Sequence, residues 1–236
     1  MNYSIIPYRI FSLGDSALTI DFGNTINEGI NKEVIARFNQ LQQDPLTGII
    51  ETVPAYSTLT IYYNVLLLRK LVPSGSTVFE WMKEQLEEKL KIPVQEYVMA
   101  ERIIRIPVCY EDDFSPDLRQ QAAAKNIAVD EVIQIHTSSC YKVYMLGFLP
   151  GFAYMGEVDE KIIMPRKSQP QNVVAGSVGI AGKQTGIYPL ASPGGWQIIG
   201  RTPLKLFDMV REEPVLLKAG FTVQFYVINK NEFKNF

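Results

Sequence analysis

The first ninety residues of the chain alternate between the hydrophobic spacing of strands and that of helices. Four short β-rich runs are separated by turn signals, at residues 8–13, 17–22, 49–53 and 58–63. Between the second and third runs, apolar residues recur at helical spacing from Ile30 to Leu41, and Asp44-Pro45 ends this stripe. A capping box formed by Thr77 and Glu80 predicts a second helix through Lys91. This order predicts a small α+β unit whose helices cover one face of a mainly antiparallel sheet.

The hydrophobic pattern changes after about residue 102. A strand is predicted at 103–110, followed by a helix that Ser115-Pro116 caps and that ends near Asn126, and then by a short helix at 130–136. Helical periodicity then disappears, and residues 140–205 hold ten of the sixteen glycines and six of the fourteen prolines. Many short strands between glycine turns predict a β-barrel or sandwich, with a domain boundary at residues 92–101.

Composition is that of an ordinary globular protein. The chain has 236 residues, of which 47% are hydrophobic and 20% charged, enough to bury a core without disulfides. A net charge of -2 argues against a general nucleic-acid-binding protein. Cys109 and Cys140 lie far apart in the sequence and form no CxxC motif, so we expect two reduced thiols. Neither a signal peptide nor a membrane-spanning run is visible. We therefore expect a cytoplasmic protein with no nucleic-acid or membrane partner.

Three familiar motifs fail on inspection. The stretch 176–185 resembles a phosphate-binding loop, but Ser177 and Gln184 stand where that loop requires glycine and Ser or Thr. The stretch 175–179 imitates the nucleophile elbow of hydrolases with alanine in the first glycine place. In that fold the histidine must follow the serine in the chain, whereas the single histidine, His136, precedes it. One histidine and two distant cysteines are too few for a zinc site, so no metal is predicted. His136 ends a predicted helix, where it either satisfies terminal carbonyls or belongs to a site.

The charge distribution carries the strongest functional signal. The segment from Lys161 to Phe207 contains no Asp or Glu but has six cations, namely Lys161, Arg166, Lys167, Lys183, Arg201 and Lys205. The net charge of -2 then leaves -8 on the rest of the chain. A positive potential over glycine-rich turns with free backbone N–H groups predicts a cleft for carboxylate, phosphate or carbamate. The alternative interpretation is a basic face exposed to solvent.

Three loops contain groups that would line such a cleft. Aromatic residues flank Pro150 at Phe148, Phe152 and Tyr154. An amide, a hydroxyl and a phenol follow at Gln184, Thr185 and Tyr188. A rigid turn holds Gly194, Gly195 and Trp196, shortly before Arg201 and Thr202. Core packing alone rarely needs so much glycine and proline, although each aromatic residue by itself is also explained by a core position.

These loops closely resemble a known family. The segments 146–156, 165–166, 175–182, 184–189 and 192–203 are similar to the family that contains the B subunit of prokaryotic 5-oxoprolinase. This family also includes allophanate hydrolase subunit 1, the KipI-type inhibitor of a sporulation histidine kinase and part of the urea carboxylase carboxyltransferase domain. The resemblance runs nearly end to end and implies an α+β domain at 1–95 followed by a cyclophilin-like β-barrel domain at 96–236. Gln171, Val174 and Phe221 depart from the family pattern.

The resemblance also implies a function. It implies one part of a multi-subunit hydrolase, which works with a homologous cyclophilin-like partner (the C subunit) and with a separate, third protein (the A subunit). Together they would open 5-oxoproline to glutamate with ATP as cofactor, and this chain would be inactive alone. The alternatives are a subunit of the allophanate hydrolase or urea carboxylase type, and a binding protein that docks onto a sensor histidine kinase and inhibits it.

The expected site accommodates a small anionic amide. Arg166, Lys183 and Arg201 are expected to bind the anion, because an arginine fork matches a carboxylate. The residues expected to be catalytic are Arg201, Gln184, Tyr188 and His136. Those expected to bind the substrate are Arg166, Lys183, Thr185, Phe148, Phe152, Gly194, Gly195, Trp196 and Thr202. Backbone N–H groups near Gly194 and Gly195 would stabilise developing negative charge, and no nucleophile is identifiable.

Overall fold

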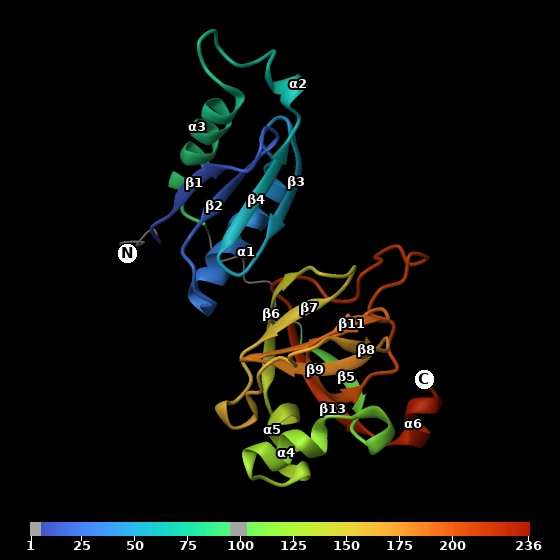
Figure 1. Cartoon of the computed structure of the whole chain (residues 1–236). Helices are drawn as coiled ribbons and strands as arrows, with labels where there is room; N and C mark the ends of the chain where they lie inside the picture. The colour runs from blue at the N-terminus through green and yellow to red at the C-terminus, as the bar shows by residue number, and fades with distance from the viewer. Residues whose placement is uncertain (1–5, 95–102) are drawn as a thin grey trace. The chain divides into compact units, whose positions relative to one another are not determined.

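The structure, a computed structural model, describes residues 6–94 and 103–236 (Figure 1). The chain groups into two compact units that divide between Met99 and Ala100. The boundary predicted at residues 95 and 96 lies outside the described residues. Among the residues that are described, no helix is long and apolar enough to cross a membrane.

The first unit is a four-stranded antiparallel sheet in the order β1-β2-β4-β3. Its strands are β1 (Arg9–Ser12), β2 (Ala17–Asp21), β4 (Thr58–Tyr63) and β3 (Ile49–Pro54). Leu18 pairs with Ile61 and Ile20 with Leu59, so these fully buried side chains share one face. That face packs against the apolar stripes of α1 (Glu28–Gln43) and α3 (Val78–Lys91) in one core. The predicted α+β arrangement is confirmed in these elements.

The helix ends of the first unit follow local sequence signals. The Asn27 side chain accepts the N–H of Ile30 at the start of α1. Thr77 and Glu80 form the predicted capping box of α3, with the Glu80 N–H donating to the Thr77 hydroxyl at 3.1 Å. A one-turn helix, α2 (Val65–Leu68), escapes prediction, because four residues are too few to show a helical period.

The second unit is a closed seven-stranded β-barrel in the order β10-β7-β6-β13-β5-β12-β9. Its strands are β10 (Gln184–Ile187), β7 (Ala153–Gly156), β6 (Cys140–Leu146), β13 (Thr222–Ile228), β5 (Ile103–Cys109), β12 (Gln197–Arg201) and β9 (Ser177–Ala181). Neighbouring strands are antiparallel except β13 and β5, which run parallel. The predicted barrel is confirmed.

Two helices, α4 (Leu118–Lys125) and α5 (Val129–Ser138), lie side by side against the barrel (Figure 1). Their apolar residues Leu118, Ala122 and Val132 join the barrel core. The end of α4 near Asn126 is confirmed, with that residue in the left-handed conformation at a φ of 54°. The predicted cap is wrong, because the Ser115 hydroxyl donates to the carbonyls of Tyr110 and Glu111 while Asp117 occupies the N-cap position.

Short elements complete the second unit. A two-stranded ribbon pairs β8 (Gln171–Val173) with β11 (Ser192–Gly194). Single 3₁₀ turns form at η1 (Asp112–Phe114) and η2 (Glu160–Ile162), and the chain ends in α6 (Lys230–Lys234).

Candidate functional site

The two-residue period of β10 places neighbouring candidate residues on opposite faces of the barrel wall. Ile187 belongs to the barrel core, and the Thr185 hydroxyl lies 3.0 Å from a ring nitrogen of the buried His136. Gly186 and Tyr188 instead face outward, toward the ring of Phe152. Gln184 shares the outward face by alternation. Tyr188 and Gln184 therefore cannot meet Thr185 around one ligand on the outer face.

Five aromatic side chains form a layer on this outer face. The Phe152 ring is central, with its centroid 4.8 Å from Tyr154, 5.2 Å from Tyr188 and 5.4 Å from Trp196. The Phe148 ring meets Phe152 edge to face at 5.6 Å, a favourable aromatic geometry. Phe152, Tyr188 and Trp196 are buried, whereas Phe148 is 60% exposed. The aromatic layer thus has a buried floor and an exposed rim.

The backbone of Phe148 is held in an unusual conformation. Its φ is 68°, in the left-handed region that non-glycine residues rarely occupy and that costs them on the order of 1–2 kcal/mol. The turn projects the Phe148 ring toward solvent while it still contacts Phe152 and Tyr188. Such strain at an exposed ring is typical of a binding surface.

Glycines beneath the layer make room for its rings. A Cβ at Gly186 would lie 3.0 Å from Trp196 Cζ3 and 3.2 Å from Phe152 Cζ, and one at Gly194 would overlap the Tyr188 hydroxyl. The expectation that glycine-rich turns leave N–H groups free is wrong for Gly176 and Gly182, which donate to the carbonyls of Tyr188 and Met164. Much of the glycine content therefore serves close packing.

Arg166 is the cation placed beside the aromatic layer. It is exposed, and its Nε would be 3.8 Å from a Cβ on Gly195. Burial raises the pKa of the Tyr154 and Tyr188 phenols above the ordinary value. The positive charge of the nearby Arg166 lowers both pKa values, but its effect is smaller than that of burial. Both phenols are therefore protonated at neutral pH. Within the described ranges, Arg166 forms no ion pair, so its fork is available to an anion.

The four lysines of the acid-free segment all have carboxylate partners from elsewhere. Lys161 pairs with Glu131 at 3.8 Å, Lys167 with Asp117 at 2.6 Å, Lys183 with Glu157 at 3.6 Å and Lys205 with Asp208 at 4.0 Å. The prediction of one uncompensated positive cleft is thus wrong for these four side chains. Lys183 lies in the turn between β9 and β10, and its partner Glu157 directly follows the last residue of β7. Glu157 therefore competes with an anionic ligand for the Lys183 ammonium.

Arg201 and Thr202 belong to a different part of the barrel. Arg201 ends β12, five residues after Trp196, which at about 3.3 Å per residue separates their backbones by roughly 16 Å. The Arg201 Nε donates to the Ala175 carbonyl at 2.9 Å, and its guanidinium lies 5.7 Å from the centre of the Phe233 ring. Thr202 is buried, and its hydroxyl accepts the N–H of Leu204. The structure does not bring these two residues to Arg166.

His136 is buried in the second unit, in a chain of hydrogen bonds in which each donor and acceptor can be assigned. Thr185 Oγ1 donates its single proton to the Gly179 carbonyl at 3.1 Å, so it accepts from His136 Nε2 at 3.0 Å. His136 Nδ1 then accepts from the Tyr110 hydroxyl at 2.7 Å. Burial lowers the pKa of His136 to about 3, so the ring is neutral with its proton on Nε2. The predicted capping of helix carbonyls by this ring is wrong, because both nitrogens have other partners.

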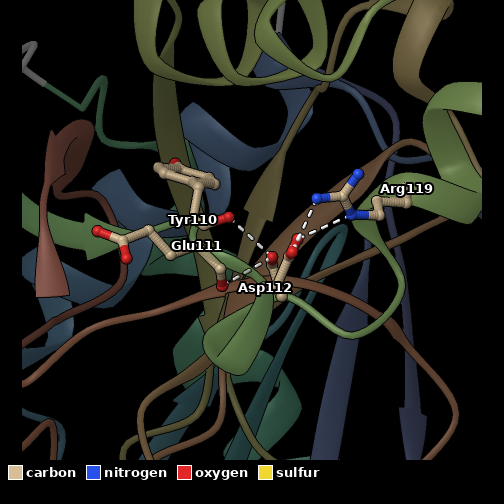
Figure 2. A network of polar contacts seen from close by, with 5 residues as sticks. Tyr110, Glu111, Asp112 and Arg119 are labelled. Atoms are coloured by element: carbon tan, nitrogen blue, oxygen red, sulfur yellow. Dashed lines mark hydrogen bonds and ion pairs between the residues drawn. The ribbon is translucent and has the colours of Figure 1, made fainter.

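The structure contains a surface depression of about 360 Å³ that the sequence does not predict. It is lined by Glu111, Asp112, Asp113 and Arg119. Arg119 holds Asp112 with two hydrogen bonds of 2.7 and 2.8 Å, as Figure 2 shows. Asp113 pairs with the Lys230 side chain, and Glu111 accepts the Lys230 N–H at 2.8 Å. Because every carboxylate here has a partner, the depression is a junction between η1, α4 and α6.

Metal and thiol chemistry find no support in the described part of the chain. No group of three or more His, Cys, Asp or Glu side chains is placed there to hold a metal ion. Cys109 is buried, which raises the pKa of its thiol, and Cys140 is exposed; both are free. The candidate site is therefore the aromatic layer with Arg166, Gly194 and Gly195.

The sequence and fold are those of a carboxyltransferase-type domain. Residues 8–217 match the family model of the carboxyltransferase domain, subdomain C and D, and the chain belongs to this family. It is 45% identical to the 5-oxoprolinase B subunit of Bacillus subtilis (strain 168) over 97% of this chain and 96% of that protein. It is 35% identical to the 5-oxoprolinase B subunit of Escherichia coli O157:H7 over 92% and 94% of the two chains.

Solved structures share this fold. The crystal structure of TTHA0988 has a TM-score of 0.77 and 33% identity, covering 90% of this chain and 40% of that longer chain. PH0987 from Pyrococcus horikoshii is 41% identical with a TM-score of 0.55, covering 95% of this chain and all of the other. Urea amidolyase of Kluyveromyces lactis, 18% identical with a TM-score of 0.71, shares the fold, and this chain spans 16% of it.

Proposed function

We propose that this chain is the B subunit of a multi-subunit ATP-dependent 5-oxoprolinase, which hydrolyses 5-oxoproline to glutamate. The observation that carries the proposal is the similarity to the 5-oxoprolinase B subunit of Bacillus subtilis, 45% identity over nearly the full length of both proteins. The two units are proposed to be separate domains, at 1–95 and 96–236, the second a cyclophilin-like barrel. A cytoplasmic location follows from the same assignment.

The aromatic layer suits a small ring that bears a carboxylate. The Arg166 guanidinium would hold the carboxylate through two parallel hydrogen bonds. The apolar face of the ring would pack on Phe148 and the rim of the layer. Tyr154 and Tyr188 are protonated and Gln184 faces outward, so these groups would orient the lactam amide. The backbone N–H group of Gly195 would stabilise negative charge on the amide oxygen, whereas Gly194 pairs with Gln171 in the β8–β11 ribbon.

The remaining chemistry is assigned to partner subunits. The described residues contain no phosphate-binding loop and no cluster of carboxylates to hold a metal ion with a triphosphate, so they do not fit an ATP site of their own. No nucleophile lies in the aromatic layer. We therefore place ATP binding and the attack on the amide with the homologous C subunit, which would also be cyclophilin-like, and with the separate A subunit. The catalytic or binding roles that the sequence predicts for Arg201, Thr202, Lys183, Thr185 and His136 are not used in this proposal, and substitution of Arg201 and Thr185 tests two of them.

The test uses the enzyme assembled from the three proteins. Arg166→Lys keeps the charge but loses the fork, and we expect it to lower kcat/KM for 5-oxoproline by about tenfold or more. Arg211→Lys is the matched control, because Arg211 is exposed and its ion-pair partner is Asp208 rather than a residue of the layer. Equal activity in the two variants would remove Arg166 from the site. An assembly with no activity, together with inhibition of a sensor histidine kinase by this chain, would favour the inhibitor alternative instead.

A further inference from the structure

Arg166 is carried on an irregular segment, residues 163–170, which we call the strap. The strap lies between η2 and β8. Its backbone is fixed on both sides of Arg166: the Pro165 carbonyl accepts the Gln197 amide at 3.0 Å, and the Lys167 N–H donates to the Gly195 carbonyl at 2.7 Å. Both partners belong to the stretch that carries Trp196, so the strap is joined to the chain segment that builds the aromatic layer.

Lys167 anchors the strap through its side chain. Its ammonium lies 2.6 Å from Asp117 Oδ2 and 2.7 Å from Gln171 Oε1. The two charged side chains are only 14% and 12% exposed. Neighbouring residues of the strap therefore have different environments, with Lys167 engaged by the fold and Arg166 exposed beside the phenols.

Asp117 is used in an unexpected way. It occupies the N-cap position of α4, where an aspartate ordinarily accepts helix N–H groups, yet its side chain makes no capping bond. Its Oδ2 instead accepts the Ile198 N–H at 2.6 Å, and its own N–H donates to the Ile198 carbonyl at 3.0 Å. One carboxylate thus joins α4, β12 and the strap.

We propose that Lys167 and Asp117 are a positioning pair that fixes the Arg166 guanidinium at the aromatic layer, where it binds the carboxylate of the substrate; this rests on the proposed function. A largely buried ion pair is a poor source of stability, because its desolvation offsets its attraction and apolar replacements are often tolerated. Its placement between the strap and β12 supports a positioning role, since a displacement of about 1 Å at a binding group can cost up to 100-fold in rate.

The experiment is a double-mutant cycle on KM for 5-oxoproline in the assembled enzyme. Lys167→Met should raise KM about tenfold with kcat within about twofold of the parent, because binding geometry is lost while the chemistry at the partner subunits is not. In an Arg166→Ala background the same substitution should change KM by less than about twofold. Lys167→Arg, which retains the charge, should restore most of the affinity. Lys161→Met is the control, since Lys161 is exposed and forms only a long ion pair, of 3.8 Å, with Glu131.

The outcomes separate this inference from the proposed function. If Arg166→Ala raises KM but Lys167→Met does not, or if the two effects multiply, the positioning role is overturned and the function stands. If Arg166→Ala leaves KM unchanged, the substrate site itself is overturned, and the positioning role with it. Should Lys167→Met fail to fold, the double variant Lys167→Met with Asp117→Asn, which leaves no uncompensated charge, replaces it in the cycle.

Discussion

The single histidine of the chain predicts how stability depends on pH. The ring of His136 is fully buried and neutral, with a pKa lowered to about 3 from an ordinary value of 6.5. In the unfolded chain the ring takes up a proton below about pH 6.5, whereas the folded protein resists protonation down to about pH 3. The contribution of the neutral His136 ring to the free energy of unfolding is therefore complete above pH 6.5 and is lost as the pH falls toward 3.

The size of this effect follows from the difference in pKa. Each pH unit in that window removes about 1.4 kcal/mol, so lowering the pH from 7.5 to 4.5 should cost about 3 kcal/mol through this residue. Titrating carboxylates add their own dependence, which a His136→Gln variant shares. Glutamine keeps a donor and an acceptor for Thr185 and Tyr110 but does not titrate.

The assay is urea unfolding monitored by Trp196 fluorescence in a Trp81→Phe background, which leaves one tryptophan and reports on the barrel. The free energy of unfolding of the parent, minus that of His136→Gln, should fall by about 3 kcal/mol between pH 7.5 and 4.5. Parallel pH curves for the two proteins would refute the reasoning. So would an NMR titration of the folded protein in which the ring protonates between pH 5 and 7, a measurement that needs no variant.

Three further substitutions probe the packing around the site. Thr185→Val removes the acceptor for His136, so we expect a loss of about 1–3 kcal/mol in the free energy of unfolding with turnover per folded molecule retained; a loss of turnover at unchanged stability would place Thr185 in the site. Gly186→Ala sets a methyl group 3.0 Å from Trp196 Cζ3 and should cost about 1–3 kcal/mol, measured by the shift of the urea midpoint, with no shift contradicting the packing of the layer. Arg201→Lys loses the bond to the Ala175 carbonyl and should lower Tm by a few degrees while the assembled enzyme keeps its turnover; a tenfold loss of turnover at constant Tm would assign Arg201 to the substrate.

Local signals in the sequence predict most of the elements. Thr77 and Glu80 mark the start of α3, and Asn126 marks the end of α4, because capping and left-handed termini depend on neighbouring residues. The grouping of Gln184 and Thr185 as ligands of one site ignores the strand period of two, which already separates their side chains. The strand period by itself therefore argues against one ligand that touches both side chains.

Charge pairing is not predictable from neighbouring residues. Lys167 and Asp117 are fifty positions apart in the sequence, and the barrel brings them within 2.6 Å. A segment without carboxylates therefore says little about the charge around each of its lysines. Arg166 differs from its neighbour only because the strap leaves it exposed while Lys167 is engaged, a choice that depends on tertiary contacts.

If this chain supplies half of a divided 5-oxoprolinase site, its activity must depend on assembly. The most direct measurement is ADP and glutamate release from 5-oxoproline and ATP by the purified chain alone, by the A and C subunits without it, and by all three together. We expect no turnover in the first two mixtures and equal molar release of ADP and glutamate in the third. Turnover by the chain alone, or an inactive complete assembly, would contradict the account.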